Sequence, residues 1–196
     1  NDKTILYYPL DSWFIKITEV KQRMFELNQT INWKPKSTGE GRFGNWLANA
    51  NDWNLSRSRY WGIPLPIWRT EDGKEELCIG SVEELKHEMQ KAVNAGIMKK
   101  ALFKDFIVGD FSDSNYSKID LHKNIVDAIT LVSPSGNLMK RESDLIDEWF
   151  DSGPMPYAQW HYPFENKNYI DDNKIFQEDY IAEGVARDFK GVSFKL

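Results

Sequence analysis

The chain has 196 residues, of which 41% are hydrophobic and 28% charged, values that are ordinary for a soluble globular protein of one sizeable domain or two small ones. A formal net charge of −5 at pH 7 argues against a free-standing protein that coats nucleic acid, while leaving room for a local basic patch. The single cysteine, Cys78, excludes an internal disulfide framework and a cysteine-based zinc ribbon, which makes a cytoplasmic location the default expectation.

The N-terminal quarter is expected to contain two strands followed by two helices. Residues 4–10 and 13–17 are predicted strands, since every second residue of 13–17 is Trp or Ile. Thr18 is a plausible N-cap for a helix that ends at Asn28, and a second helix is expected from residue 41 or 42 to residue 51. The chain starts as if within a strand, without a signal-peptide layout, and no run approaches the roughly 18–20 apolar residues that cross a bilayer. We therefore expect a piece of a longer protein that is not associated with a membrane.

The stretch NWLANANDWNLSRSRYWGIPLPIW, residues 45–68, is the most informative part of the sequence. Aromatic residues and two prolines surround Arg57 and Arg59, whose guanidinium groups suit phosphate or carboxylate and also stack on rings. Together with the neighbouring Trp61, these arginines are candidate contacts for an anionic ligand. The alternative is an aromatic core patch with two solvated arginines. Gly62 fits a sharp turn or a close approach to a ligand.

The next segment is expected to form a strand and a hairpin. Residues 62–68 have the pattern of a buried strand, but Pro64 and Pro66 cannot donate ladder hydrogen bonds, so the strand must lie at an edge or contain a bulge. The Asp-Gly pair within residues 69–76 predicts the turn of a polar hairpin, and residues 77–79 follow as a short strand.

A helix is predicted in the middle of the chain. Ser81 and Glu84 form a capping box at its start, and Gly96 closes it. Its apolar side chains fall on one face, which is expected to pack against a core. Beyond it, the strands expected are 125–132, 138–140 and 180–185, with a turn at 133–136 and a short helix at 144–149.

The titratable residues give two weak signals. Asp144, Asp147 and Asp151 bracket Trp149, a pattern that suggests either a glycosidase or, more simply, a helix N-terminus whose acids complement the dipole. The histidines lack metal-ligand spacing and the cysteine stands alone, so no metal site is expected. The histidines, interpreted as structural residues or residues of a polar face, are His87, His122 and His161.

Two stretches resemble motifs of the isoleucyl-tRNA synthetases, which are class I aminoacyl-tRNA synthetases. Residues 53–68, WNLSRSRYWGIPLPIW, resemble W-x-I-S-R-x-R-Y-W-G-x-P-x-P, and residues 144–166, which begin DLIDEWFDSGPMPY, resemble D-x-x-D-x-W-F-D-S-G. The resemblance covers roughly residues 5–80 and 119–185. It implies that the parent protein is a ligase that activates isoleucine with ATP, assisted by Mg²⁺, and charges tRNA(Ile) for translation.

The resemblance also implies which residues approach the substrate. Asp151, Ser152 and Gly153 correspond to a turn beside the aminoacyl-adenylate pocket, while Pro154 stands where relatives commonly have Ser. The catalytic residues themselves are not identified by this correspondence.

A third segment resembles the family and then departs from it. Glu183 and Gly184 match the start of E-G-x-D-Q-x-R-G-W-F, which lines the amino-acid and adenylate pocket in the family. Ala186 and Arg187 stand where the family has Asp and Gln, and alanine cannot pair with the ammonium group of the substrate. The H-I-G-H and K-M-S-K-S motifs, which position ATP in class I enzymes, do not occur in the sequence. This chain alone is therefore expected to be inactive and to bind neither ATP nor Mg²⁺.

The fold class expected is mixed α/β (α+β), a partial Rossmann-type catalytic core with short strands and a helical connective insertion. The insertion is interpreted as a small helical subdomain on the surface, with tRNA contact through its lysines, Lys99, Lys100 and Lys104, as a weaker alternative. The segments expected are the exit from the editing insertion and the start of the second half of the core at 1–50, a core strand segment at 51–80, the helical insertion at 81–119, and the return to the core before the KMSKS region at 120–196.

Three alternatives stay open from the sequence. A valyl- or leucyl-type relative is the nearest, although those families usually differ at R-Y-W-G and D-S-G. A stand-alone tRNA-binding module and a Trp-rich carbohydrate-binding domain belong to other classes of protein. The sequence carries no indication of the oligomeric state.

Overall fold

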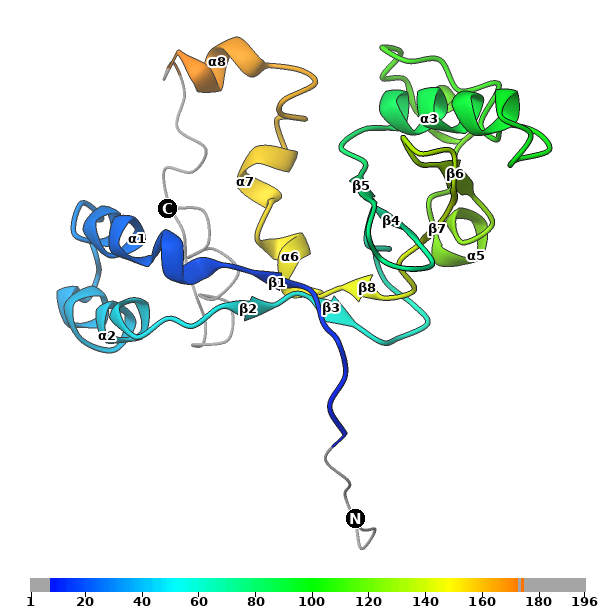
Figure 1. Cartoon of the computed structure of the whole chain (residues 1–196). Helices are drawn as coiled ribbons and strands as arrows, with labels where there is room; N and C mark the ends of the chain where they lie inside the picture. Colours follow the sequence, from blue (N-terminus) through cyan, green and yellow to red (C-terminus); the bar gives the residue numbers. More distant parts are fainter. Residues whose placement is uncertain (1–7, 173, 175–196) are drawn as a thin grey trace, which may run out of the picture. The chain divides into compact units, whose positions relative to one another are not determined.

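The computed structural model describes residues 8–172 and 174, and it divides the chain into two compact units. Unit 1 combines Asn1–Leu55 with Asp147–Leu196, and unit 2 is Ser56–Ile146. The mixture of helices and short strands that the sequence predicts is confirmed in the described part (Figure 1). No helix there is long and apolar enough to cross a membrane.

Unit 2 is built on a four-stranded antiparallel sheet. Its strands are Ile67–Thr70 (β4), Glu76–Cys78 (β5), Thr130–Val132 (β6) and Leu138–Arg141 (β7), in the order β5-β4-β7-β6. Trp68 of β4 lies opposite Arg141 of β7, and Leu131 of β6 lies opposite Met139. Because alternate residues of a strand point to the same face, β4 and β7 each bury every second side chain.

Helix α3 (Val82–Asn94) supplies the other half of this core. Its buried residues Leu85, Met89 and Ala92 belong to one hydrophobic cluster with Trp68 and Leu131 of the sheet, and Figure 1 shows the helix beside β6. The helix is therefore part of the main core of unit 2 and not a separate surface body. The interpretation of residues 81–119 as an insertion within the family stays a prediction.

The predicted boundaries of α3 are confirmed. The Ser81 hydroxyl accepts a hydrogen bond from the Glu84 backbone N–H at 3.1 Å, as a capping box requires. The Glu84 carboxylate accepts from the N–H of Gly80, at 2.7 Å, and so satisfies the donor one residue before the N-cap. Gly96 follows the helix with φ of +73°, a conformation that glycine adopts without strain.

Three predicted elements of unit 2 are wrong in extent or type. The strand expected at 62–68 begins only at Ile67, because Pro64 makes no more than an isolated bridge, to Leu145. The strand expected at 125–132 starts as helix α5 (Lys123–Val126), and the helix expected at 144–149 contains a strand, β8 (Leu145–Ile146). For β8, pairing with the distant strand β3 decides the local conformation, whereas α5 is held by local bonds to the carbonyls of His122 and Lys123.

Unit 1 is assembled from short elements. Its helices are a 3₁₀ turn at Ile17–Glu19 (η1), α1 (Lys21–Asn28), a π-helical turn at Thr38–Phe43 (η2), α2 (Gly44–Ala48), α6 (Trp149–Ser152), α7 (Met155–Ala158) and α8 (Lys167–Asp171). Phe14–Ile15 (β1) pairs with Trp53–Asn54 (β2). The buried hydrophobic residues, packed against flanking tryptophans, are Ile17, Met24, Phe43, Leu47 and Ala50.

Several local predictions for unit 1 need correction. Helix α1 ends at Asn28 as expected, but its N-cap is Val20 and not Thr18. The hydroxyl and backbone N–H of Thr18 instead donate to the Asp52 carboxylate, at 2.8 and 3.0 Å. The second predicted helix starts earlier, as η2, and residues 8–10 of the first predicted strand form no strand, while the rest of that strand lies outside the described residues.

The direction of the strands can be compared with the predicted Rossmann-type core. All strand pairs in residues 8–172 are antiparallel. The described part thus contains short strands and helices of a mixed fold, without a parallel nucleotide-binding sheet of its own.

Candidate functional site

Residues 56–68 of the first motif and 144–146 of the second lie side by side in unit 2. Strand β3 (Ser56–Arg57) carries the first motif and pairs antiparallel with β8 of the second, so that Arg57 lies opposite Leu145 (Figure 1). The first motif then turns and returns along the other edge of β8. There the Ile146 N–H donates to the Ile63 carbonyl at 2.7 Å, and the Leu65 N–H to the Asp144 carbonyl at 3.2 Å.

The turn between these two passages depends on Gly62. Its φ is +144°, in the region that favours glycine, and a Cβ there would meet the Leu145 side chain at 3.4 Å. The expectation of a sharp turn at this glycine is confirmed. The turn presents Tyr60 and Trp61 to solvent, with exposed fractions of 75% and 73%.

The three candidate anion contacts lie on this turn and on β3. Arg57 is half-buried and its Nη1 donates to the Ser56 carbonyl at 2.8 Å, whereas Arg59 is exposed. The Trp61 ring stacks on the imidazole of His122, with centroids 4.7 Å apart and an interplanar angle of 24°. The alternative of an aromatic core patch is wrong for Trp61, because this ring is exposed and stacks on a ring from another loop, and the anion contact stays a prediction.

A shallow pocket lies beside this stacked pair. It is lined by Tyr60, Trp61, Gly62, His122, Lys123 and Asn124. Two aromatic rings, an imidazole and a lysine make this pocket suitable for a flat or anionic ligand.

The His122 ring is fixed by Asp120. The carboxylate Oδ1 lies 2.7 Å from His122 Nδ1 and also accepts the His122 backbone N–H at 2.9 Å. The bond from this backbone N–H, followed by the side-chain bond, lowers the pKa of Asp120, so the carboxylate is ionised at neutral pH. With Nδ1 facing a carboxylate, the ring is oriented as in many histidines that meet a ligand through Nε2.

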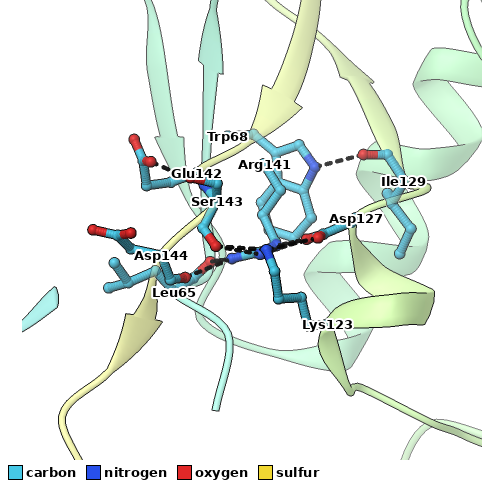
Figure 2. Close-up of polar contacts among 9 residues, drawn as sticks. All are labelled: Leu65, Trp68, Lys123, Asp127, Ile129, Arg141, Glu142, Ser143 and Asp144. Atoms are coloured by element: carbon cyan, nitrogen blue, oxygen red, sulfur yellow. Dashed lines mark hydrogen bonds and ion pairs between the residues drawn. The ribbon is translucent and has the colours of Figure 1, made fainter. Parts of the chain in front are cut away.

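Behind the pocket, Arg141 forms a buried polar cluster (Figure 2). Its side chain is 1% exposed, and its Nε donates to Asp127 Oδ1 at 2.6 Å. Its Nη1 donates to the carbonyls of Leu65, at 3.1 Å, and Asp144, at 3.0 Å. One guanidinium group thus joins the residue before β8 to the segment that runs along one edge of β8.

Lys123 completes this cluster. Its Nζ donates to the Ser143 carbonyl at 2.6 Å and lies 2.8 Å from Asp127 Oδ2. Burial opposes ionisation of Asp127, but the hydrogen bonds from Lys123 and Arg141 outweigh it and the pKa of Asp127 is lowered. We call Arg141, Asp127 and Lys123, with the carbonyls that they bind, the Arg141 clasp.

In unit 1, Asp147 connects the same two motifs. It is buried, its Oδ2 accepts from Trp53 Nε1 at 3.0 Å, and its backbone N–H donates to the Leu55 carbonyl at 2.8 Å. Its Oδ1 lies 3.3 Å from the Trp149 N–H, at the start of α6. Asp147 is thus an acid at the N-terminus of α6, as the sequence predicts, and it also joins this helix start to Trp53 and Leu55.

The D-S-G turn belongs to α6 and the residue after it. The Ser152 hydroxyl donates to the Trp149 carbonyl at 3.1 Å, and the Gly153 N–H donates to the same carbonyl at 3.0 Å. Partial desolvation, followed by the nearby charge of Glu148, raises the pKa of Asp151, although this residue remains exposed. Asp151, Ser152 and Gly153 lie in unit 1, whereas Arg57, Arg59 and Trp61 lie in unit 2.

The remaining candidates lie outside the described residues. They are Glu183 and Gly184, together with the departures at Ala186 and Arg187. Sequence reasoning missed the roles of His122, Asp120 and Arg141. The D-L-H-K string containing His122 was visible, but the Arg141 neighbourhood, LMKRESD, has the composition of a solvated surface turn.

Comparison with known proteins places this arrangement in a family. The sequence profile of the class I tRNA synthetases (I, L, M and V) matches residues 1–193. The chain is 67% identical over 186 residues to the isoleucine–tRNA ligase of Bacteroides thetaiotaomicron, a match that covers 94% of this chain and 16% of the relative. The ligase of Porphyromonas gingivalis is 64% identical over 184 residues, with the same coverage, and that of Clostridium novyi is 44% identical over 185 residues, covering 94% of this chain and 15% of the relative. The chain thus spans about one-sixth of the length of these curated relatives. It belongs to the class I tRNA synthetase family that comprises the isoleucine, leucine, methionine and valine enzymes.

Proposed function

We propose that this chain is a segment of an isoleucine–tRNA ligase, a cytoplasmic enzyme that activates isoleucine with ATP and transfers it to tRNA(Ile). The observation that carries the proposal is the similarity to proteins named isoleucine–tRNA ligase across 94% of the chain. Membership in the synthetase family favours this function over the carbohydrate-binding and stand-alone tRNA-binding alternatives.

The geometry of unit 2 supports a role in binding an anionic substrate. Arg57 and Arg59 lie on a strand and turn that β8 and the Arg141 clasp hold in place, with Trp61 beside them. A guanidinium group binds phosphate oxygens in pairs, and both an aminoacyl-adenylate and tRNA carry phosphate. We therefore propose Arg57, Arg59 and Trp61 as contacts for such a phosphate-bearing substrate.

The D-S-G turn is proposed to line the aminoacyl-adenylate pocket together with Glu183 and Gly184. In support, α6 is anchored by Asp147, and the raised pKa of Asp151 indicates a partly desolvated carboxyl group at the turn. These assignments rest on the family resemblance, and we assign no catalytic step to any of the residues.

The proposal for the complete enzyme includes Mg²⁺. No group of three or more His, Cys, Asp or Glu side chains in the described residues could hold a metal ion. We assign to the residues of this chain only the binding and orientation of the substrate.

The experiment that tests the proposal is isoleucine-dependent exchange between ATP and pyrophosphate. We expect exchange by the complete gene product with isoleucine, much weaker exchange with leucine, methionine or valine, and none by the 196-residue chain alone. A complete protein that responds to one of the other amino acids and not to isoleucine contradicts the assignment. Exchange by the chain alone contradicts its expected inactivity.

A pair of arginine variants tests the proposed substrate contact. Arg59→Ala is expected to lower kcat/KM by about 10- to 100-fold, because a charge-assisted hydrogen bond contributes about 1.5–3 kcal/mol. The matched control is Arg23→Ala, which removes an exposed arginine of α1 outside both motifs and should leave kcat/KM unchanged. Equal kinetics of the two variants would remove Arg59 from the site.

A further inference from the structure

The stack between Trp61 and His122 brings together two loops of unit 2 that are far apart in the sequence. The rings lie 4.7 Å apart and nearly parallel, yet Trp61 remains 73% exposed. A large exposed ring ordinarily samples several rotamers, and fixing it when a ligand binds costs free energy. A ring that is already stacked in the free protein avoids most of that cost.

The imidazole is itself well fixed. Asp120 holds the ring through Nδ1 and the backbone through the His122 N–H, with one carboxylate oxygen serving both. His122 is also the N-cap of α5, and its carbonyl accepts from the N–H groups of Ile125 and Val126, at 2.9 and 3.1 Å. The side chain and main chain of His122 therefore have little freedom to move.

The Arg141 clasp extends this fixation to both walls of the pocket. Lys123, next to His122, is bound to Asp127 and to the Ser143 carbonyl. Arg141 binds the same Asp127 and the Leu65 carbonyl, which lies just beyond the turn that carries Trp61 (Figure 2). The loop of His122 and the loop of Trp61 are thus tied to one buried guanidinium group.

We propose that His122 is a positioning residue for Trp61: held by Asp120 and by the Arg141 clasp, it keeps the indole in one orientation as a preformed wall of the substrate pocket. This inference rests on the proposed function, because it takes the pocket beside Trp61 to receive part of the aminoacyl-adenylate. His122 acts through Trp61 and has no chemical step of its own.

The test is titration calorimetry of a non-hydrolysable isoleucyl-adenylate analogue into the complete gene product and its variants. His122→Ala removes the platform and is expected to weaken binding about fivefold, the effect of losing an aromatic pair. His122→Phe retains a ring and is expected to bind within about twofold of the unsubstituted protein. The matched control, His87→Ala, removes an exposed histidine of α3 and should change nothing.

The outcomes separate this inference from the proposed function. Unchanged binding by His122→Ala overturns this inference and leaves the proposed function standing. Equally weak binding by His122→Phe and His122→Ala also overturns it, because the effect would then come from the lost contact between the imidazole and Asp120. Failure of the unsubstituted protein to bind the analogue overturns the proposed function, and the inference falls with it. Melting temperatures of the variants identify a loss of folding. If His122→Ala is unstable, His122→Leu fills the space without an aromatic ring, and binding by His122→Leu as tight as by His122→Phe overturns the inference.

Discussion

Unit 2 and unit 1 stabilise their candidate residues in different ways. In unit 2 a four-stranded sheet and the 13-residue helix α3 enclose one hydrophobic cluster, and the buried Arg141 ties the loops to it. In the described part of unit 1 the helices are eight residues or fewer, and those before residue 50 pack around Phe43 and neighbouring tryptophans. Because helices that short are unstable alone, unit 1 depends on side-chain packing and a few polar ties for its conformation.

The comparison bears on function. The residues that line the pocket beside Trp61 belong to unit 2, which contains a four-stranded sheet. We therefore expect this pocket to be formed before a ligand binds. The D-S-G turn lies on the four-residue helix α6, whose start is fixed chiefly by Asp147. We therefore expect the turn to respond more to its surroundings than the Trp61 pocket does.

The largest effect is expected from breaking the Arg141 clasp. Arg141→Met leaves three backbone carbonyls and Asp127 without this guanidinium, and should lower the free energy of unfolding by about 3–5 kcal/mol. Urea unfolding gives the size, and hydrogen exchange followed by mass spectrometry should show the loss of protection concentrated in Ser56–Ile146.

The control for this variant is Arg69→Met on the adjacent strand. The side chain of Arg69 is 36% exposed and pairs with Glu76 and Glu142, so its removal should cost about 1 kcal/mol or less. Equal destabilisation by the two variants would show that burial of Arg141 gives it no special structural role.

A smaller effect is expected from removing the two side-chain hydrogen bonds of Asn28 in unit 1. The Asn28 side chain is 1% exposed, accepts from Trp33 Nε1 at 2.9 Å and donates to the Gly39 carbonyl at 3.0 Å. Asn28→Ala leaves both groups without this partner and should destabilise unit 1 by about 1–3 kcal/mol. Hydrogen exchange should place the change in α1 and η2, and the exposed Asn32→Ala serves as the neutral comparison.

Next in size is the cap of α3. Ser81→Ala removes the hydroxyl that accepts from the Glu84 N–H, and should cost about 1 kcal/mol in urea unfolding. Ser81→Asp keeps an accepting oxygen at the same position and should restore most of the stability. If the two variants were equally destabilised, the capping bond would not be the source of the effect.

Local signals of the fold were predictable from the sequence. The Asp-Gly turn of the hairpin, the capping box, the apolar face of α3 and the end of α1 each depend on residues within a few positions of one another. The same holds for the turn at Gly136, with φ of +84°. Such features follow from backbone preference and side-chain spacing alone.

The candidate site was only partly predictable, because its geometry depends on distant pairing. The sequence identified Arg57, Arg59 and Trp61, but nothing near them indicates that β8 pairs with β3 or that His122 stacks on Trp61. Arg141 follows a lysine in a charged stretch and gave no signal of burial. Arg141 becomes buried only when folding brings Leu65, Asp127 and Asp144 into contact with its guanidinium group.

The smallest effect is expected from the exposed hydrogen bonds that join Thr18 of η1 to Asp52, which precedes β2. Hydrogen bonds from the backbone N–H and the hydroxyl of Thr18 lower the pKa of Asp52. A carboxylate whose pKa is lowered by folding stabilises the fold above its unfolded pKa of about 3.9, and this contribution is lost as the pH falls through the folded value. Stability of unit 1 should therefore decline below about pH 4 in part because of Asp52.

Two variants isolate this contribution. Asp52→Asn keeps an accepting oxygen without the titrating charge, and should flatten the pH dependence of unfolding below about pH 4. The change in the free energy of unfolding should be smaller than that caused by Ser81→Ala, because the carboxylate is exposed. Thr18→Val keeps the charge but removes the hydroxyl donor, and should leave a weaker dependence in the same direction. A pH profile that neither variant alters would show that the hydrogen bonds between Thr18 and Asp52 make no measurable contribution to the stability of unit 1.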